Sequence, residues 1–423
     1  MKLVIISDTH FGNPDCTLFV HGRDNKPVPG MKYQQFLKKA GKKNDYLVLV
    51  GDIMDFAMSS YEEAYNIARA FFIQIQKDKI ADQIIYIPGN HDEDIWHTVE
   101  QEVNIIGRIK EGKFPRKFKM SLPGIIDDRV SSKKKQFTLP GIEKRRIMGK
   151  IGYGGLFLDT ITGKGAKKTR FNFVYPNMYI ATDSDSVLIT HGHYFETYWS
   201  LLSEWAPDIF GKDLPISIPM ALREMISINF PTNQLSCSGI GQAGTLTDAI
   251  RNTEIDIRHH HVKSLDRYLN NLAAKLAGDR NYSWYDPKRF IWVVVGWWVK
   301  KQILGSVRTI EEARYNREFM QKPEVQDRFK RYYQRSCEEI KSLNKKYGYD
   351  LPLPSVVIFG HTHQPSAWNS DDMHIDVQEG RTIRLCNTGG WLANARDTSV
   401  KEFYGAEVFK YQTENGFSSE TVM

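Results

Sequence analysis

Apolar runs alternate with amphipathic segments along the first hundred residues, which is typical of an α/β fold. Runs of apolar, β-prone residues predict strands at 4–7, 47–50 and 83–87. Between them, 31–43 and 61–77 carry apolar residues at three- and four-residue steps, which predicts amphipathic helices. The order strand, helix, strand, helix, strand predicts parallel strands joined by right-handed crossovers.

Strand patterns return in the second half of the chain. They predict strands at 178–181, 186–190, 356–359, 382–385 and 407–411. A tight turn is predicted at 387–390, and the last residues are expected to be frayed. The stretch 108–150 is weakly periodic and rich in Lys, Gly and Pro, so a long, partly mobile loop or hairpin is expected there, with further loops over 152–174.

The stretch 194–354 has a different character and reads as a mainly helical insertion. Helices are predicted around 263–277, 287–304 and 309–347, with a capping box formed by Thr309 and Glu312 and a second segment that begins at Pro323. We therefore divide the chain into a core of residues 1–193 with a basic insertion at 108–150, a cap of residues 194–354, and a closing core segment of residues 355–423.

Aromatic residues concentrate in this insertion, which holds six of the nine tryptophans. The simplest interpretation is that they fill a core of its own. The run 290–299 is apolar on all sides, so it could be a buried hairpin or helix, or a surface that meets a bilayer interface where Trp is favourable. The histidine triplet 259–261 is expected to be a polar surface rather than a metal site.

Composition and cysteine usage indicate a cytoplasmic globular protein. The chain has 423 residues, of which 41% are hydrophobic and 25% charged, enough for two cores or one core with a large insertion. Four cysteines are scattered without close pairs, which predicts neither a thiolate metal site nor a disulfide framework. No signal-peptide pattern is present, and the longest apolar run, 290–299, is too short to cross a bilayer.

The positive charge of the chain is confined to one segment. The net charge is +7, yet 108–150 holds fourteen Lys and Arg against four Asp and Glu, a surplus of +10 that leaves the remainder at −3. Such a run is usually a solvated loop, but it could also contact anionic lipid at the inner membrane surface or nucleic-acid phosphate. Aromatic residues do not interleave regularly with its basic residues, so a base-stacking channel is not indicated. The sequence does not define an oligomeric state.

Five of the predicted strands end in clusters of polar residues. The clusters are Asp8 and His10; Asp52 and Asp55; Asn90, His91 and Asp92; His191 and His193; and His361 and His363. Ligands of open α/β sheets bind at the carboxyl ends of the strands. So many buried polar groups at one edge would be costly unless cations occupied it, and imidazole and carboxylate without thiolate suit zinc, manganese or iron.

The order and spelling of these clusters resemble the calcineurin-like metallophosphoesterases. The pattern of that family is Asp-x-His, Gly-Asp-x-x-Asp, Gly-Asn-His-Asp/Glu, a strand-terminal His and Gly-His-x-His, and every element is present here in order. The resemblance covers about 1–105, 178–193 and 355–411. It implies a four-layer α/β/β/α sandwich with two divalent metal ions at one edge, manganese being favoured over iron or zinc.

The resemblance also implies roles for individual residues. The metal ligands would be Asp8, His10 and His363 at the first position, Asn90, His191 and His361 at the second, and Asp52 between the two. His91 matches the catalytic general acid of the family, and Asp55 the carboxylate that orients it. His193 could contact the phosphoryl group or support a ligand from behind.

The reaction implied is hydrolysis of a phosphomonoester, phosphodiester or pyrophosphate by a metal-bridging hydroxide, with His91 protonating the departing oxygen. The protein phosphatase branch has an Arg where this chain has Phe56, which argues against a phosphoprotein substrate. Family members that cleave lipid-linked sugar pyrophosphates also carry an insertion, so an amphiphilic or lipid-linked substrate is favoured. The alternatives are a nucleotide or nucleic-acid phosphoesterase and a non-catalytic binding or scaffold protein on the same fold.

Overall fold

The computed structural model describes residues 1–132, 135–142, 146–147, 150–151, 156–159, 161–162, 169–210, 220–234, 318–371, 373–377, 380–397 and 400–423, together with 267 and 271. The statements below refer to these residues. The predicted helices around 263–277 and 287–304, except for those two single residues, lie outside them. So do the histidine triplet, the apolar run 290–299, and the capping box of Thr309 and Glu312.

The first sheet has the strand order β19-β18-β1-β4-β5-β9. As predicted, β1 (Lys2–Ile6), β4 (Asn44–Val50) and β5 (Ala81–Ile87) are parallel neighbours. β18 (Ala406–Gln412) lies antiparallel to β1, and β9 (Arg170–Phe173) lies parallel to β5 within a stretch that we expected to be loop. The expectation of a frayed C-terminus is wrong, because β19 (Gly416–Val422) pairs with β18 along its whole length.

The second sheet has the order β13-β15-β12-β11-β10-β6, with β14 (His374–Val377) paired to β15 outside this path. Its strands are β13 (Pro365–Ser366), β15 (Arg381–Thr388), β12 (Val356–Phe359), β11 (Ser186–Thr190), β10 (Asn177–Ala181) and β6 (Gly124–Asp127). The basic segment is therefore not only a loop, because β6 is a fully buried strand parallel to β10.

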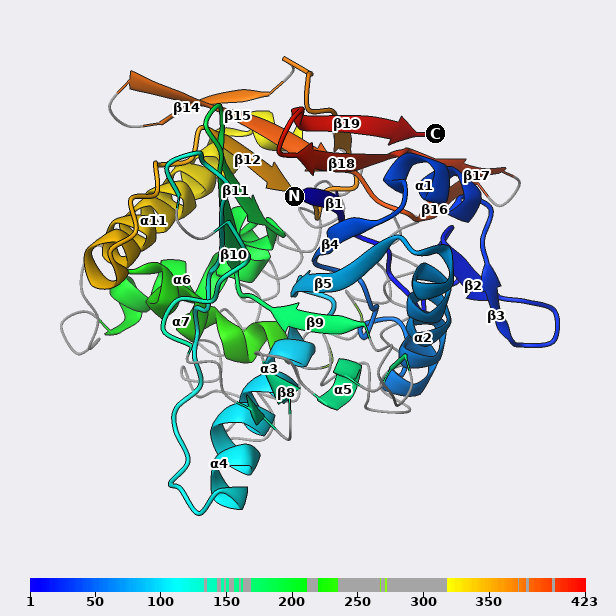
Figure 1. The fold of residues 1–423 in the computed structure, drawn as a ribbon, viewed down its shortest axis with the longest axis horizontal. Coiled ribbons are helices and arrows are strands. Elements are labelled where there is room, and N and C mark those ends of the chain that lie inside the picture. The colour runs from blue at the N-terminus through cyan, green and yellow to red at the C-terminus, as the bar shows by residue number, and fades with distance from the viewer. Residues whose placement is uncertain are drawn as a thin grey trace, which may run out of the picture.

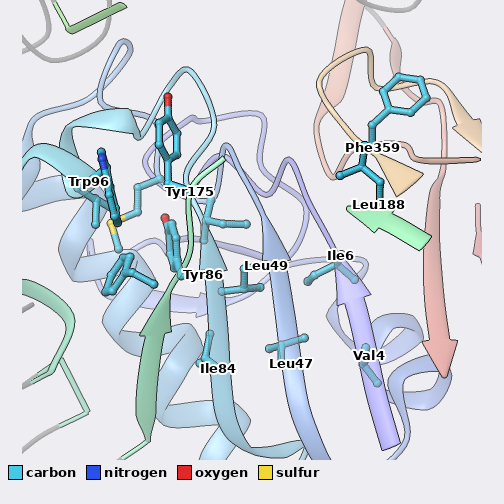
Figure 2. Close-up of a cluster of buried hydrophobic side chains, with 14 of the residues drawn as sticks. Val4, Ile6, Leu47, Leu49, Ile84, Tyr86, Trp96, Tyr175, Leu188 and Phe359 are labelled. Carbon is cyan, nitrogen blue, oxygen red and sulfur yellow. The ribbon is translucent and has the colours of Figure 1, made fainter. Parts of the chain in front are cut away.

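The two sheets pack face to face, and the alternation of side chains along each strand sets which residues meet. In β1, Leu3 and Ile5 join the apolar layer between the sheets, whereas Val4 and Ile6 face the outer layer of helices. The same alternation holds in β4, where Val48 belongs to the inter-sheet layer. Figure 2 shows the helix-facing side chains of β1, β4 and β5 in adjacent rows.

Helices cover the outer faces of both sheets and complete an α/β/β/α sandwich (Figure 1). α1 (Tyr33–Ala40) and α2 (Tyr61–Asp78) pack on the first sheet, and α2 starts at a capping box of Ser60 and Glu63. α11 (Pro323–Tyr347), which begins at Pro323 as predicted, packs on the second sheet through Tyr332, whose hydroxyl lies 2.9 Å from the hydroxyl of Thr190. The last part of the stretch that we assigned to the cap thus forms a layer of the core.

Two helices between β11 and β12 were not predicted at their positions by the sequence analysis. α6 (Thr197–Phe210) and α7 (Leu222–Gln234) contain Pro207 and Pro231, residues that usually end a helix. The helices are joined by Asn229, whose amide donates to the hydroxyl of Ser203 at 2.8 Å. None of the helices in the described part of the chain is both long enough and apolar enough to cross a bilayer.

Shorter elements connect these layers. They are β2 (Phe19–His21), β3 (Pro27–Pro29), α3 (Glu93–Gln101), η1 (Glu102–Ile106), α4 (Gly107–Lys110), β7 (Arg146–Ile147), β8 (Lys150–Ile151), α5 (Leu156–Asp159), η2 (His193–Phe195), η5 (Phe319–Gln321), β16 (Ala393–Asp397) and β17 (Val400–Phe403). Of these, α3 and η2 leave the sheets directly at polar strand ends, which makes them relevant to the site.

Replacement of Phe417 tests whether the C-terminal strand belongs to the core. Phe417 is 7% exposed, and its ring centroid lies 4.7 Å from that of Trp368 and 4.8 Å from that of Tyr411. We expect Phe417→Ala to lower the free energy of unfolding by about 3 kcal/mol, measured by chemical denaturation. Phe114→Ala is the matched control, because Phe114 is 90% exposed and its loss should change stability by less than about 0.5 kcal/mol. Equal stabilities of the two variants would contradict the packing of β19.

Candidate metal centre

The polar ends of the five strands meet at one edge of the sandwich. Within the first sheet, the backbone N–H of His10 donates to the carbonyl of Asp52 at 2.9 Å. Within the second, the N–H of Gly360 donates to the carbonyl of His191 at 3.0 Å. Between the sheets, the N–H of His361 donates to Asp8 Oδ2 at 3.0 Å. The structure therefore brings together all the clusters that the sequence analysis singled out.

The backbone at this edge is strained. Five of the eight non-glycine residues with positive φ in the described chain belong to the clusters. They are Asp8 (52°), His10 (48°), Asp52 (52°), His361 (68°) and His363 (55°). Each such residue costs of order 1–3 kcal/mol and persists only where its surroundings enforce it. Strain concentrated on the polar residues of one site indicates that their side-chain directions matter for function.

Two glycines allow the strand ends to approach this closely. A Cβ on Gly51 would lie 2.4 Å from the His191 Nδ1 atom, and one on Gly360 would lie 2.2 Å from Asp8 Oδ2. Any side chain at either position would displace a residue of the cluster. Glycine is therefore required before Asp52 and before His361 in the sequence motifs, because a larger residue would clash with the cluster.

The first group of potential metal ligands consists of Asp8, His10 and His363. Their donor atoms all lie within 4.8 Å of one another, and all three residues are buried. The His363 Nε2 atom lies 3.2 Å from His10 Nε2 and 3.4 Å from Asp8 Oδ1. Two imidazole nitrogens and a carboxylate oxygen this close together can share a cation.

The second group consists of Asp52, His191 and His361, whose donor atoms also lie within 4.8 Å of one another. Asn90 joins it, because its Oδ1 lies 3.1 Å from His191 Nε2. Asp52 Oδ2 lies 3.3 Å from His191 Nε2 and 3.7 Å from His10 Nε2. A single carboxylate oxygen therefore stands between the two groups.

The imidazoles of these groups are held in place through the ring nitrogen that faces away. His10 Nδ1 lies 3.1 Å from Asp55 Oδ2, and His191 Nδ1 lies 2.9 Å from the carbonyl oxygen of Val50. Acceptors at these positions fix the tautomer, so that the lone pair of the other nitrogen points into the site.

Glu196 provides the acceptor that orients the imidazole of His361. The sequence analysis missed this residue. Its Oε2 accepts a hydrogen bond from His361 Nε2 at 2.7 Å, and the carboxylate is 1% exposed. The buried Nδ1 of His361 has no hydrogen-bond partner among the described residues, which leaves it available as a ligand. The only signal in the sequence is a carboxylate five residues after His191, and η2 turns it back toward the site.

Asp55 links the metal-binding cluster to His91. Its Oδ1 lies 2.8 Å from His91 Nδ1, while its Oδ2 faces His10 Nδ1 and accepts from the amide of Asn13 at 3.0 Å. The donor atoms of His10, Asp55 and His91 also lie within 4.8 Å of one another, at distances that ordinary hydrogen bonds account for. His91 is thereby held beside the cluster without itself belonging to the two ligand groups.

Asp92 has a purely structural position. It accepts hydrogen bonds from the backbone N–H groups of Ile53 at 2.8 Å and of Gly89 at 2.7 Å, and from the Tyr86 hydroxyl. These bonds tie the loop after β4 to the loop after β5. Asp92 therefore fixes the relative positions of Asp52 and Asn90 through these hydrogen bonds.

Burial and charge move the titration of the carboxyl groups in opposite directions. Burial raises the pKa of Asp8 to about 7, because the charge of His191 offsets only part of the desolvation. Burial acts the same way on Asp55, but the charge of His91 and the hydrogen bond from His10 outweigh it and hold that pKa well below its usual value. Asp8 is thus a carboxyl group short of neighbouring positive charge, which a divalent cation would supply.

The histidines are shifted for the same reasons. Burial lowers the pKa of His10 and of His361, which favours the neutral imidazole that a metal requires. For His191, burial is outweighed by the charge of Asp52, which raises the pKa to about 9. Imidazole, carboxylate and amide oxygen form a donor set that fits a divalent metal such as manganese, iron or zinc.

The α/β/β/α sandwich with a buried Asp and His cluster at the shared edge of its sheets is the architecture of a metal-dependent phosphoesterase. Comparison with protein families agrees with it: the model of the calcineurin-like phosphoesterase family matches residues 1–365, and the chain belongs to this family. A search of curated proteins found no match.

Substitution of Glu196 tests its support of His361. We expect Glu196→Ala to weaken metal binding at one of two positions by about 10- to 100-fold, because the imidazole loses the acceptor that orients it. Glu196→Gln keeps an acceptor without the charge and should fall between this variant and the wild type. Equilibrium dialysis against manganese with metal analysis gives the affinities, and Glu62→Ala, at an exposed position of α2, is the control. Unchanged affinity at both positions in Glu196→Ala would refute the assignment.

Proposed function

We propose that this protein is a dinuclear metal-dependent phosphoesterase that hydrolyses a phosphomonoester, a phosphodiester or a pyrophosphate. The supporting observation is the position of Asp52 Oδ2 between the two ligand groups. The ligands proposed are Asp8, His10 and His363 in one group, Asn90, His191 and His361 in the other, and Asp52 in both. When bound, two divalent cations, preferably manganese, would supply Lewis acidity and an activated water molecule.

His91 is proposed as the general acid of this reaction. Its Nδ1–H donates to Asp55 Oδ1, and the Asp55 carboxylate stabilises positive charge on the ring. A protonated imidazole held in this way would donate its other N–H to the departing oxygen, which leaves as a neutral hydroxyl once it receives the proton. Asp55 positions this ring and does not itself need to contact the substrate.

His193 is proposed to contact the phosphoryl group or to support the second ligand group. It is 1% exposed, and its ring centroid lies 5.5 Å from that of His191. Neither ring nitrogen has a hydrogen-bond partner within the described part of the chain. A buried imidazole beside the ligands with both nitrogens unsatisfied is suited to a polar group that arrives with the substrate.

The substrate is proposed to be amphiphilic or lipid-linked, and the chain is proposed to act in the cytoplasm. Trp199, from the first helix of the insertion, has its ring centroid 6.3 Å from that of His193, so an aromatic side chain lies next to this histidine. Phe56 is fully buried, with its ring centroid 4.6 Å from that of Tyr61, and is no phosphate ligand. The division into core 1–193, cap 194–354 and core 355–423 is also a proposal, and in it α11, at the end of the cap stretch, packs on the second sheet of the core.

Removal of metal tests the reaction class. We expect chelator-treated protein to lose hydrolysis of p-nitrophenyl phosphate or of its bis-ester, and to regain it with two equivalents of manganese. A panel of lipid-linked pyrophosphates, nucleotides and phosphorylated sugars then distinguishes the amphiphilic substrate from a nucleotide. Manganese-loaded protein that cleaves no member of the panel would instead favour a non-catalytic binding protein.

Substitution of His91 tests the general acid. We expect His91→Ala to lower kcat by about 10²- to 10⁴-fold while two metal ions remain bound, since His91 lies outside both ligand groups. The loss should be smaller for substrates whose leaving group is already acidic, such as p-nitrophenol. His374→Ala, at an exposed histidine of β14, is the control. Full activity of His91→Ala toward a substrate with a poor leaving group would rule out the role.

A further inference from the structure

A helical arm projects from the lower edge of the molecule in the view of Figure 1. It consists of residues 102–119: η1 and α4 continue the direction of α3, the chain turns at Gly112, and an extended segment runs back. α3 begins at Glu93, directly after His91 and Asp92. The helical stretch from Glu93 to the end of α4 therefore carries the arm roughly 27 Å away from the candidate catalytic loop, at about 1.5 Å per residue.

The arm is built by hydrogen bonds along its length. The N–H of Lys113 donates to the carbonyl of Arg108 at 2.9 Å, and the N–H of Arg116 donates to the carbonyl of Asn104 at 2.9 Å. At its base, Trp96 Nε1 donates to the carbonyl of Lys119 at 3.1 Å. The returning segment thus lies along the helix and holds the tip in a defined shape.

The tip presents apolar side chains to water. All nine residues from 109 to 117 are exposed. Phe114 is 90% exposed, Ile109 58% and Ile106 44%, so three of the eight exposed large apolar residues of the described chain lie on this arm. Apolar side chains grouped on a projection, rather than scattered singly, mark a surface that another phase or molecule covers.

Basic residues surround these apolar side chains. Between 108 and 119 the chain carries six Lys and Arg, namely Arg108, Lys110, Lys113, Arg116, Lys117 and Lys119, against one acidic residue, Glu111. Glu111 is paired with Lys113 at 2.7 Å, with both side chains about half exposed. The tip therefore combines a strong positive charge with large apolar groups.

We propose that this arm docks on the surface of an anionic phospholipid bilayer. Phe114 and Ile109 would enter the boundary between headgroups and acyl chains, while the lysines and arginines lie among the lipid phosphates. Nucleic acid fits less well, because phosphate contacts would leave Ile106, Ile109 and Phe114 in water and a single exposed aromatic ring, that of Phe114, offers no stacking platform. The arm shares no residue with the metal centre, so this proposal stands or falls independently of the proposed reaction.

Flotation of the full-length protein with lipid vesicles tests this docking. The probes are vesicles of phosphatidylcholine alone and of phosphatidylcholine with 30% phosphatidylglycerol, at low and at physiological salt. We expect the protein to float with the anionic vesicles and not with the neutral ones, and binding to weaken as salt rises. The same protein should not be retained by duplex DNA or RNA under conditions in which it binds vesicles.

Two variants separate the apolar from the charged part. Ile109→Ser with Phe114→Ser should weaken binding to anionic vesicles by about tenfold or more, since burial of one such side chain is worth about a factor of ten. Lys110→Gln, Lys113→Gln, Arg116→Gln and Lys117→Gln together should abolish the preference for anionic lipid. The control is Val130→Ser with Lys42→Gln, which removes an exposed apolar and an exposed basic residue outside the arm.

All variants should have the melting temperature of the wild type and should hydrolyse a water-soluble ester at the wild-type rate. The substituted side chains are exposed and far from the metal centre. Failure of the wild type to float with anionic vesicles at low salt would overturn the proposal. The proposal would also be overturned if both arm variants bound anionic vesicles as tightly as the wild type does. It would be overturned as well if the protein were retained on nucleic acid but did not bind vesicles. Stronger quenching of a Phe114→Trp variant than of the wild type, which already has nine tryptophans, by spin-labelled lipid would show insertion directly, and equal quenching of the two bound proteins would exclude it.

Discussion

Asp8 forms hydrogen bonds that connect the two sheets, and the geometry of the metal centre depends on this connection. Its carboxylate accepts from the backbone N–H of His361, and its carbonyl accepts from the N–H of Trp391 at 3.0 Å. Each ligand group combines residues of both sheets: His363 meets Asp8 and His10, and Asp52 meets His191 and His361. A slip of one sheet against the other would therefore divide both groups at once. The apolar layer between the sheets, which includes Ile5, Val48 and Ile358, resists such a slip.

The residues of the site lower the stability of the protein, and the packing of the rest of the fold offsets this loss. Carboxyl and imidazole groups are buried together, and several stand on strained backbone. Either feature alone costs stability. The packed sheets and their helical layers offset this cost, and bound cations would reduce it further by compensating carboxylates such as Asp8. The least favourable local structure in the molecule is thus the part that carries the chemistry, as expected for a site whose geometry is imposed by its surroundings.

The sequence predicted the parts of this structure that are encoded locally. Strands such as β4 and the Asp52 cluster behind it are visible because the apolar run and the motif are contiguous. β6 and β9 were missed because each contains polar or charged residues and is defined by its neighbours in the sheet. α6 and α7 were missed because Pro207 and Pro231 argue against a helix. Glu196 could not be assigned, since its partner His361 is distant in the sequence and only the turn of η2 brings the two together.

The topology delays the appearance of the site during synthesis. β1 is synthesised before the other described strands but completes its pairing only with β18, where Lys2 lies opposite Gln412. His10 and His363 are 353 residues apart in the chain, so the first ligand group cannot assemble until the whole segment between them has left the ribosome. Contacts of such long range fold slowly. A nascent chain therefore carries an incomplete first sheet and lacks that group until His363 and β18 have emerged, so metal binding by that group follows rather than guides the early folding of the core.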